Sequence, residues 1–370
     1  MEKHFLRNVL LKGLGLFLLF NLLWTQVDMS RLGSYSLYDH LFRGRERFPF
    51  GESPAEAYNF SLYNLNAMFE SLSIDAQEIP VNEFRVIVIG DSSTWGTLLR
   101  PEETLAGQLD ALRLVTPDGR KIRFYNMGYP TLSLTKDLMI LQEAMSYEPD
   151  LILWPVTLES FPRDRQLDSP IAANNLHRIQ ELQHKDSLNL DLPAETRSPL
   201  EIAFSRTILG QRRPLADLMR LQIYGVMWSA TGIDQVYPVD YTPAARDLEA
   251  DTTFNGWKGP ALDAGLLSMD VLSAGVKAAG DVPVMIINEP ILVSSGKNAD
   301  LRYNFYYPRW AYDTYRVLLS ESSNTEDWTY LDLWNLVPQE HFTNSAIHLD
   351  PQGVKMEAQT LLPKIEGYWK

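Results

Sequence analysis

Along most of this chain, apolar residues recur with one of two periods, which predict strands and helices in alternation. Phe84 to Ile89 is a mainly apolar, β-branched run, as expected for a strand buried on both faces. Similar runs predict four further strands, at Lys121 to Met127, Leu151 to Trp154, Val282 to Ile287 and Thr329 to Trp334.

Helical periodicity occupies the intervals between these strands. Leu105, Leu109 and Leu112 recur at i, i+4 and i+7 after Pro101, a residue suited to a first helical turn. Further helices are predicted with Thr135 as a cap, over 261–279, over 308–321 and after Asp350-Pro351. Strands that alternate with helices predict an α/β domain over residues 81–370, with a mainly parallel sheet and helices on both faces.

The alternation stops over residues 161–260, which are polar and interrupted by prolines. We interpret this region as an insertion in the domain. Within it, Leu218 to Trp228 is mostly apolar and predicts a helix. Packing in a core is the default for such a helix, and the alternative is contact with a bilayer or with a membrane partner.

The N-terminus has the pattern of a membrane span. Residues 1–8 include Lys3 and Arg7, and residues 9–27 form an apolar run with Trp24 near its far end. A run of about 20 residues can cross a hydrocarbon core. Because the positive charges precede the run, we expect a signal anchor in the cell membrane, with a cytoplasmic N-terminus and an extracytoplasmic domain. A cleaved signal peptide, for which no small-residue cleavage site is present, and a buried core helix are the alternatives.

Residues 28–80 are predicted to connect this anchor to the domain. The segment is rich in arginine and aromatic residues that could contact anionic headgroups: Phe42, Arg43, Arg45, Arg47, Phe48 and Phe50. A solvated turn followed by an edge strand explains the same pattern equally well.

Composition narrows the chemistry of the chain. It has 47 acidic and 33 basic side chains, a net charge of −14 that argues against nucleic acid as a partner. It has no cysteine, which excludes disulfides, thiolate metal sites and a cysteine nucleophile. The six histidines show no metal-ligand spacing, so no metal site is expected.

Polar side chains follow the strands at one rim of the predicted sheet. Gly90-Asp91-Ser92 follows the first strand, and the loop after the last strand contains His348. Because ligands bind outside the carboxyl ends of parallel strands, these residues are expected to share one site. A histidine can take the proton of a serine hydroxyl and make the oxygen nucleophilic. For each residue alone, a role in a turn, cap or core is the alternative.

The order of these motifs resembles the SGNH, or GDSL-like, hydrolase superfamily over about residues 84–368. The resembling blocks are Gly90-Asp91-Ser92, Gly128, and the loop with His348 that precedes the last helix. The resemblance implies a flavodoxin-like three-layer sandwich with Ser92 as nucleophile and His348 as base. It also implies that the N–H groups of Ser92 and Gly128 are oxyanion donors and that no cofactor is needed.

One block departs from the family's pattern after the third strand. The family's usual Gly-x-Asn-Asp is replaced by Pro155-Val156-Thr157-Leu158, which lacks the asparagine that donates to the oxyanion. The hydroxyl of Thr157 is the candidate substitute.

A second departure concerns the group that orients the histidine. Where the family usually has Asp-x-x-His, this chain has Ser345 three residues before His348, with Asn344 beside it. Either a Ser–His dyad is sufficient, or a carboxylate such as Glu289 or Asp350 comes from elsewhere, or the site is inactive. Asn288 and Glu289, after the fourth strand, could bind substrate, position the histidine or cap a turn, and Asp91 is a further accessory candidate.

Three functions follow. An N-terminal anchor with an SGNH-like domain is similar to the alginate O-acetylation proteins and the D-alanine transfer protein of teichoic acids. This similarity implies acyl transfer to or from an extracytoplasmic glycan through an acyl-enzyme, with a multi-span membrane-bound O-acyltransferase as partner. The second function is a stand-alone, membrane-tethered esterase or lipase. The third is an inactive scaffold or binding subunit of a membrane complex.

Overall fold

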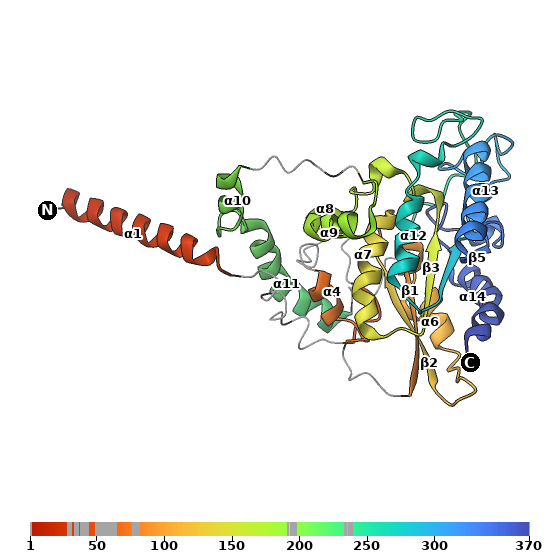
Figure 1. Cartoon of the computed structure of the whole chain (residues 1–370), viewed down its shortest axis with the longest axis horizontal. Coiled ribbons are helices and arrows are strands. Elements are labelled where there is room, and N and C mark those ends of the chain that lie inside the picture. Colours follow the sequence, from red (N-terminus) through yellow and green to blue (C-terminus); the bar gives the residue numbers. More distant parts are fainter. Residues whose placement is uncertain are drawn as a thin grey trace.

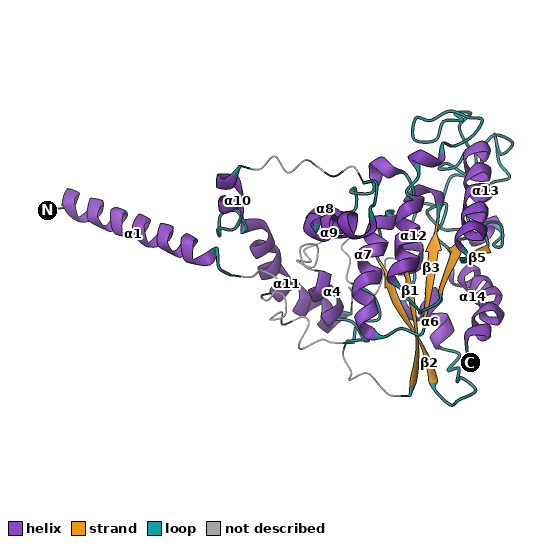
Figure 2. Ribbon diagram, viewed as in Figure 1, coloured by secondary structure: helices purple, strands orange, loops and turns teal. Residues whose placement is uncertain are grey.

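The domain is built on one parallel β-sheet of five strands in the order β2-β1-β3-β4-β5 (Figures 1 and 2). The computed structural model describes residues 2–27, 32, 37, 44–48, 65–75, 82–190, 192, 198–232, 235 and 240–369. All four strand pairs are parallel, and the strands are β1 (Glu83–Gly90), β2 (Lys121–Gly128), β3 (Leu151–Val156), β4 (Val284–Asn288) and β5 (Thr329–Asp332). This arrangement confirms the predicted α/β class.

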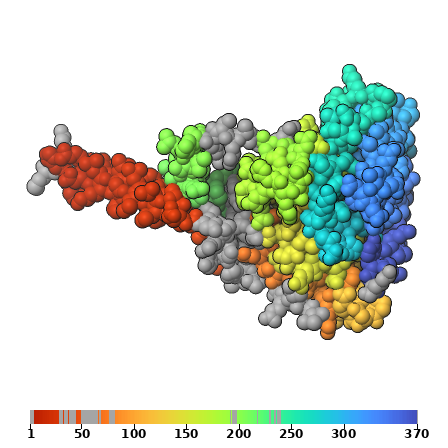
Figure 3. Space-filling model, in the orientation of Figure 1, coloured from red at the N-terminus to blue at the C-terminus, as the bar shows by residue number. Residues whose placement is uncertain are grey.

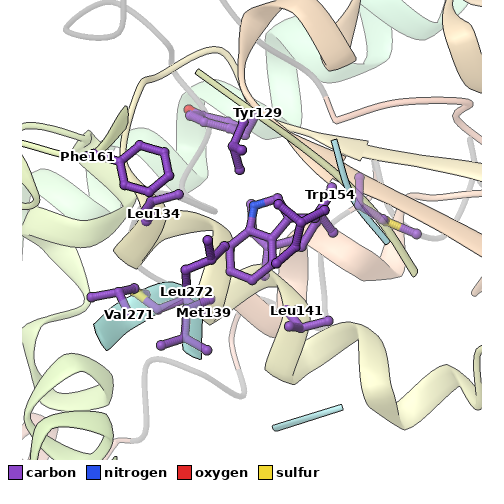
Figure 4. Close-up of a cluster of buried hydrophobic side chains, with 14 of the residues drawn as sticks. Tyr129, Leu134, Met139, Leu141, Trp154, Phe161, Val271 and Leu272 are labelled. Atoms are coloured by element: carbon purple, nitrogen blue, oxygen red, sulfur yellow. The ribbon is translucent and has the colours of Figure 1, made fainter. Parts of the chain in front are cut away.

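Alternate side chains of the strands enter two separate hydrophobic cores. On one face of the sheet, Val86 and Val88 of β1 pack with α6 (Leu105–Asp110) and α14 (Pro351–Ile365). On the other face, Ile87 and Ile89 pack with α7 (Leu134–Ala144), α12 (Met269–Ala278) and α13 (Arg309–Glu326). Figure 4 shows part of this second core, where the fully buried Trp154 of β3 lies among side chains of α7 and α12. The sheet is therefore covered on both faces.

Seven further helices complete the described chain. They are α1 (Glu2–Trp24), α4 (Leu65–Glu70), α5 (Ser92–Trp95), α8 (Pro170–Asn174), α9 (Leu176–Asp186), α10 (Pro199–Ser205) and α11 (Arg212–Thr231). Single 3₁₀ turns are η2 (Pro101–Glu103), η3 (Met145–Tyr147), η4 (Leu158–Ser160), η5 (Arg163–Arg165), η7 (Ala264–Leu266), η8 (Gln339–His341) and η9 (Glu366–Tyr368). Helices α8 to α11 lie in the region that was interpreted as an insertion.

Several predicted helix boundaries were wrong for local reasons. Ser133, not Thr135, caps α7, because its side chain accepts a hydrogen bond from the N–H of Lys136. Thr104 caps α6 after a 3₁₀ turn. This helix ends at Asp110, and Leu112, which was predicted on its apolar face, is exposed. The helix predicted over 261–279 begins only at Met269. Asp350 caps α14 as predicted.

Helix α1 is long and apolar enough to cross a membrane over His4–Trp24, and only 6% of its most apolar window is buried. A signal sequence near an N-terminus meets the same criterion. Figure 3 shows this helix projecting from the domain, with α10 and α11 near its C-terminal end (Figure 1).

The predicted headgroup contact of the connector is contradicted for two of its residues. Arg47 and Phe48 are completely buried in the domain. The Arg47 guanidinium donates to the backbone carbonyls of Trp95, Gly96, Leu99 and Gln235 at 2.7–3.0 Å, and it lies 3.9 Å from the Trp95 ring centroid. Phe42, Arg43 and Phe50 lie outside the described residues.

Candidate active site

Ser92 lies at the point where the strand order reverses. Strand β1 pairs with β2 on one side and β3 on the other, and the chain passes from β1 directly into α5, whose first residue is Ser92. Ligands of open α/β sheets bind at such a switch point, outside the carboxyl ends of the strands. The topology therefore positions Ser92 where a substrate can reach it.

Two glycines allow α5 to approach the sheet this closely. Gly90 has a φ of +153°, and a Cβ there would collide with the side chain of Thr94. At Gly128, the residue paired with Gly90 in β2, a Cβ would lie 2.5 Å from the backbone nitrogen of Trp95. Helix α5 thus packs directly on the backbone of two strand ends.

A line of three hydrogen-bonded side chains runs from Ser92 through His348 to Asn344. The Oγ of Ser92 is 2.8 Å from Nε2 of His348, and Nδ1 of His348 is 2.8 Å from Oδ1 of Asn344. Because an amide oxygen is only an acceptor, Nδ1 carries the proton and Nε2 is the lone-pair acceptor that faces the serine hydroxyl. This tautomer is the one that a general base requires.

Burial controls the charge of the histidine. His348 is half-buried, and removal of the ring from water lowers its pKa to about 4. The imidazole is therefore neutral at pH 7 and able to accept the Ser92 proton. A proton that arrives on the ring is held weakly, because the facing group is a neutral amide.

The structure places the other orienting candidates away from His348. The Asp350 carboxylate accepts the backbone N–H of Gly353 and lies 3.0 Å from Nδ1 of His341. Glu289 accepts a hydrogen bond from the Ser93 hydroxyl. Among the candidates named from the sequence, the partner of Nδ1 is Asn344, four residues before the histidine.

The remaining accessory candidates have structural partners. Ser345 is buried and the Asn288 amide lies between Asp332 and Tyr312, at 2.8 and 3.1 Å. Asp91 is the N-cap of α5 and accepts the Ser93 N–H at 2.8 Å. Asp91 is also buried, and this burial raises its pKa. Asp91 therefore fixes the start of α5.

In this structure, both predicted auxiliary oxyanion donors have hydrogen-bond partners within the protein. The N–H of Gly128 donates to Oδ1 of Asn126 at 3.0 Å. The hydroxyl of Thr157 is fully buried and pairs with the Tyr307 hydroxyl at 2.8 Å. The Ser92 N–H remains a candidate, because it lies in the first turn of α5, where helical N–H groups have no intrahelical acceptor.

Two supporting residues were not predicted from the sequence. The Asn126 amide donates to the Thr94 carbonyl at 2.8 Å and so braces α5 against β2. The fully buried Lys136 ammonium donates to the carbonyls of Gly90 and Tyr129 at 2.7 and 3.0 Å. The only sequence signal for Asn126 was a polar residue near the end of a mainly apolar strand.

A small cavity lined by two carboxyl groups lies against α5. It has a volume of about 20 Å³, and its lining includes Ser93, Glu289 and Glu357. Such a volume has room for about one water molecule. Burial raises the pKa of Glu289 well above its ordinary value and that of Glu357 to about 7. Within the described part of the chain, no three His, Asp or Glu side chains are grouped to hold a metal ion.

No protein-family model matches the chain, and no curated protein matches it. Among solved structures, it is similar to a member of the lipolytic protein G-D-S-L family from Veillonella parvula, with 10% identity, a TM-score of 0.34 and coverage of 76% of this chain and 97% of that one. It is also similar to a carbohydrate acetylesterase family member from Sinorhizobium meliloti, with 11% identity, a TM-score of 0.35 and coverage of 77% and 99%. An acetylxylan esterase from Geobacillus stearothermophilus, solved as a catalytic mutant, has 12% identity, a TM-score of 0.37 and coverage of 76% and 94%.

Proposed function

We propose that this chain is a serine acyl-ester enzyme that forms an acyl-enzyme on Ser92, with His348 as general base and Asn344 as the residue that orients it. The observation that carries the proposal is the continuous hydrogen-bonded line from Ser92 Oγ through the imidazole to Asn344, with 2.8 Å at each step. A Cys–His–Asn constellation uses the same neutral third member in papain-like proteases.

In the first half of the reaction, Nε2 of His348 takes the hydroxyl proton while Ser92 Oγ attacks the carbonyl carbon of an ester. The carbonyl oxygen becomes an oxyanion, which the Ser92 N–H in the first turn of α5 can stabilise. When the tetrahedral intermediate collapses, the imidazolium returns its proton to the leaving alkoxide. The products are an alcohol and an ester of Ser92.

In the second half, His348 takes a proton from an incoming hydroxyl, whose oxygen attacks the acyl carbon, and then returns that proton to Ser92. Water as the acceptor gives hydrolysis, and a sugar hydroxyl gives transfer. We propose that a glycan supplies this hydroxyl, either as the group that accepts the acyl chain or as the group that leaves. Tyr306 hydrogen-bonds with Ser345, three residues before His348, and its ring centroid lies 4.6 Å from that of the exposed Phe305. Aromatic faces of this kind can stack on sugar rings.

We further propose that α1 anchors the enzyme in the cell membrane, with the domain on the extracytoplasmic side and a multi-span membrane-bound O-acyltransferase as partner. The support is the length and apolar character of His4–Trp24 together with the exposure of its side chains. Lys3 and Arg7 lie at the N-terminal end of the span, which favours a cytoplasmic N-terminus.

A fluorophosphonate probe tests the acyl-enzyme proposal. The full-length protein should be labelled, Ser92→Ala should not be, and His348→Ala should be labelled far more slowly. The neighbouring Ser93→Ala is the matched control and should retain labelling. Absence of label on the intact protein, alongside a reactive control esterase, would contradict enzymatic function and favour a scaffold. For a labelled enzyme, release of acetate from an acetylated glycan or acetyl transfer to it then separates hydrolysis in water from transfer.

A further inference from the structure

Helix α10 and the residues that link it to α11 expose an unusual number of apolar side chains. Leu200 is 82% exposed, Phe204 is 53% exposed and Leu209 is 43% exposed, and Ile202 between them is also exposed. Leu200 and Phe204 are four residues apart, so they lie on the same face of α10. Large apolar side chains that are exposed together mark an interaction site more often than single ones do. We call Leu200, Phe204 and Leu209 the α10 apolar surface.

Helix α11 continues this amphipathic character. Leu221 and Gly225 on one face are buried, whereas Met219, Ile223 and Met227, at i, i+4 and i+8, are exposed. The residues therefore form an apolar stripe on the outer side of the helix. The default expectation of a core helix over 218–228 does not describe this exposed face.

A hydrogen bond fixes the α10–α11 segment to the end of the apolar N-terminal helix. The indole N–H of Trp24 donates to the side-chain oxygen of Gln211 at 2.8 Å, and Gln211 immediately precedes α11. The span His4–Trp24 has 21 residues, a length that matches the thickness of a hydrocarbon core. If α1 crosses a bilayer, Trp24 lies at the lipid–water interface, and Gln211 lies at the same depth.

The charges around the α10 apolar surface also fit a position at the lipid–water interface. Arg206 follows Phe204, and Arg212 and Arg213 begin α11. All three arginines are exposed, in a chain whose net charge is −14. Apolar side chains flanked by arginines are typical of helices that lie in the headgroup region of anionic membranes. Figure 1 shows α10 beside the C-terminal end of α1, on the side of the molecule from which α1 projects.

From these observations we propose that the α10 apolar surface inserts into the outer leaflet of the bilayer that α1 crosses, as a second, interfacial membrane contact. The proposal rests on the anchor function proposed for α1, and it does not depend on the chemistry at Ser92. Two contacts, one spanning and one interfacial, would prevent the domain from rotating freely about a single tether.

Because the chain has no cysteine, one introduced cysteine gives a unique attachment point for a fluorescent probe. Full-length Phe204→Cys would carry an NBD probe in nanodiscs that contain anionic phosphatidylglycerol, with Leu200→Cys as a second position on the surface. Val317→Cys on α13 is the matched control, because Val317 is 54% exposed and Phe204 is 53% exposed. A probe at Leu14→Cys reports whether α1 itself lies in lipid.

We expect probes at 204 and 200 to be quenched by doxyl lipids and to be about threefold less accessible to aqueous iodide than the probe at 317. Equal iodide quenching at 204, 200 and 317, with the Leu14 probe in lipid, would overturn the proposal and leave the anchor intact. A Leu14 probe in water would overturn both the anchor and this inference. If the probe at residue 204 is protected from iodide in native membranes but not in nanodiscs, the proposed lipid contact is wrong and a protein partner covers this surface. Fluorophosphonate labelling of Ser92 reports on the proposed chemistry in each case.

Discussion

The neutral third member of the site can be converted to a charged one by a single substitution, Asn344→Asp. In the present structure, the Asn344 oxygen lies 2.8 Å from Nδ1 of His348 and fixes the ring tautomer without adding charge. Burial alone sets the pKa of His348 at about 4. The wild-type enzyme should therefore keep an active, neutral base down to a pH of about 5, and its rate should fall only as the pH approaches 4.

A carboxylate at residue 344 would interact directly with the imidazolium. Two opposite charges about 4 Å apart attract by about 4 kcal/mol at an effective dielectric constant of about 20. Asn344 is exposed, so solvent reduces this value, and an adjacent opposite charge typically changes a pKa by about 1 to 3 units. We expect the pKa of His348 to rise from about 4 to between about 5 and 7 in the variant.

The rate should change with the same interaction. The imidazolium forms in the transition state, so a carboxylate that stabilises it by about 1.4–4 kcal/mol should raise kcat/KM at pH 8 by about ten- to a thousandfold. Only the added charge contributes to this increase in kcat/KM, because Asn344 already holds His348 in the tautomer with the proton on Nδ1. Asn344→Ala, which removes the acceptor, should lower the rate at every pH.

The assay is kcat/KM for p-nitrophenyl acetate between pH 4 and 9, together with titration of the His348 ring by NMR. Asn324→Asp is the matched control, since Asn324 is also exposed and the substitution adds the same charge on α13. The reasoning is refuted if Asn344→Asp titrates and reacts like this control, with the acidic limb still near pH 4.

Three further predictions concern the support of the site. Burial raises the pKa of Glu357 to about 7, so the native state holds this proton more tightly than the unfolded chain, and stability should fall as the pH rises from about 4.5 to 7, by about 3 kcal/mol in total. Glu357→Gln should remove that loss in urea titrations, and an unchanged pH dependence would contradict the assignment. Arg47→Met should lower the free energy of unfolding by about 3 kcal/mol or more, because four buried carbonyls lose a charged donor. Thermal melts against the exposed control Arg100→Met check this, and equal melting temperatures would disprove it. Gly128→Ala should reduce both stability and fluorophosphonate labelling, since its Cβ would displace the backbone of α5; normal labelling with normal stability would show that α5 can move without cost.

The sheet and the rim could be predicted because they depend on local patterns and on topology. Apolar runs such as Phe84 to Ile89 identify strands, and parallel strands must present their carboxyl ends at one edge. Ser92 and His348 follow the first and last strands of that sheet, so their proximity could be inferred although they are 256 residues apart.

The partners of individual polar atoms could not be predicted in this way. The side chain of Asn126 accepts a hydrogen bond from the N–H of Gly128, two residues further on. This local hydrogen bond competes with any ligand for the same donor. The contact of Asn344 with His348 depends on the path of an irregular loop, which no periodicity describes. Thr157 looked available from its position after β3, but the buried Tyr307 from another segment occupies its hydroxyl.

The buried guanidinium of Arg47 also constrains the order in which the chain can fold. Its acceptors lie 48 residues away at Trp95 and 188 residues away at Gln235. At synthesis rates of about 5–20 residues per second, the second acceptor emerges about 10–40 s after the arginine. Until then the charge must remain hydrated, because burial without all its acceptors is costly. Packing of Arg47 against the end of α5 is thus a late, non-local step, and a chain interrupted before Gln235 would lack one of the four acceptors of this guanidinium.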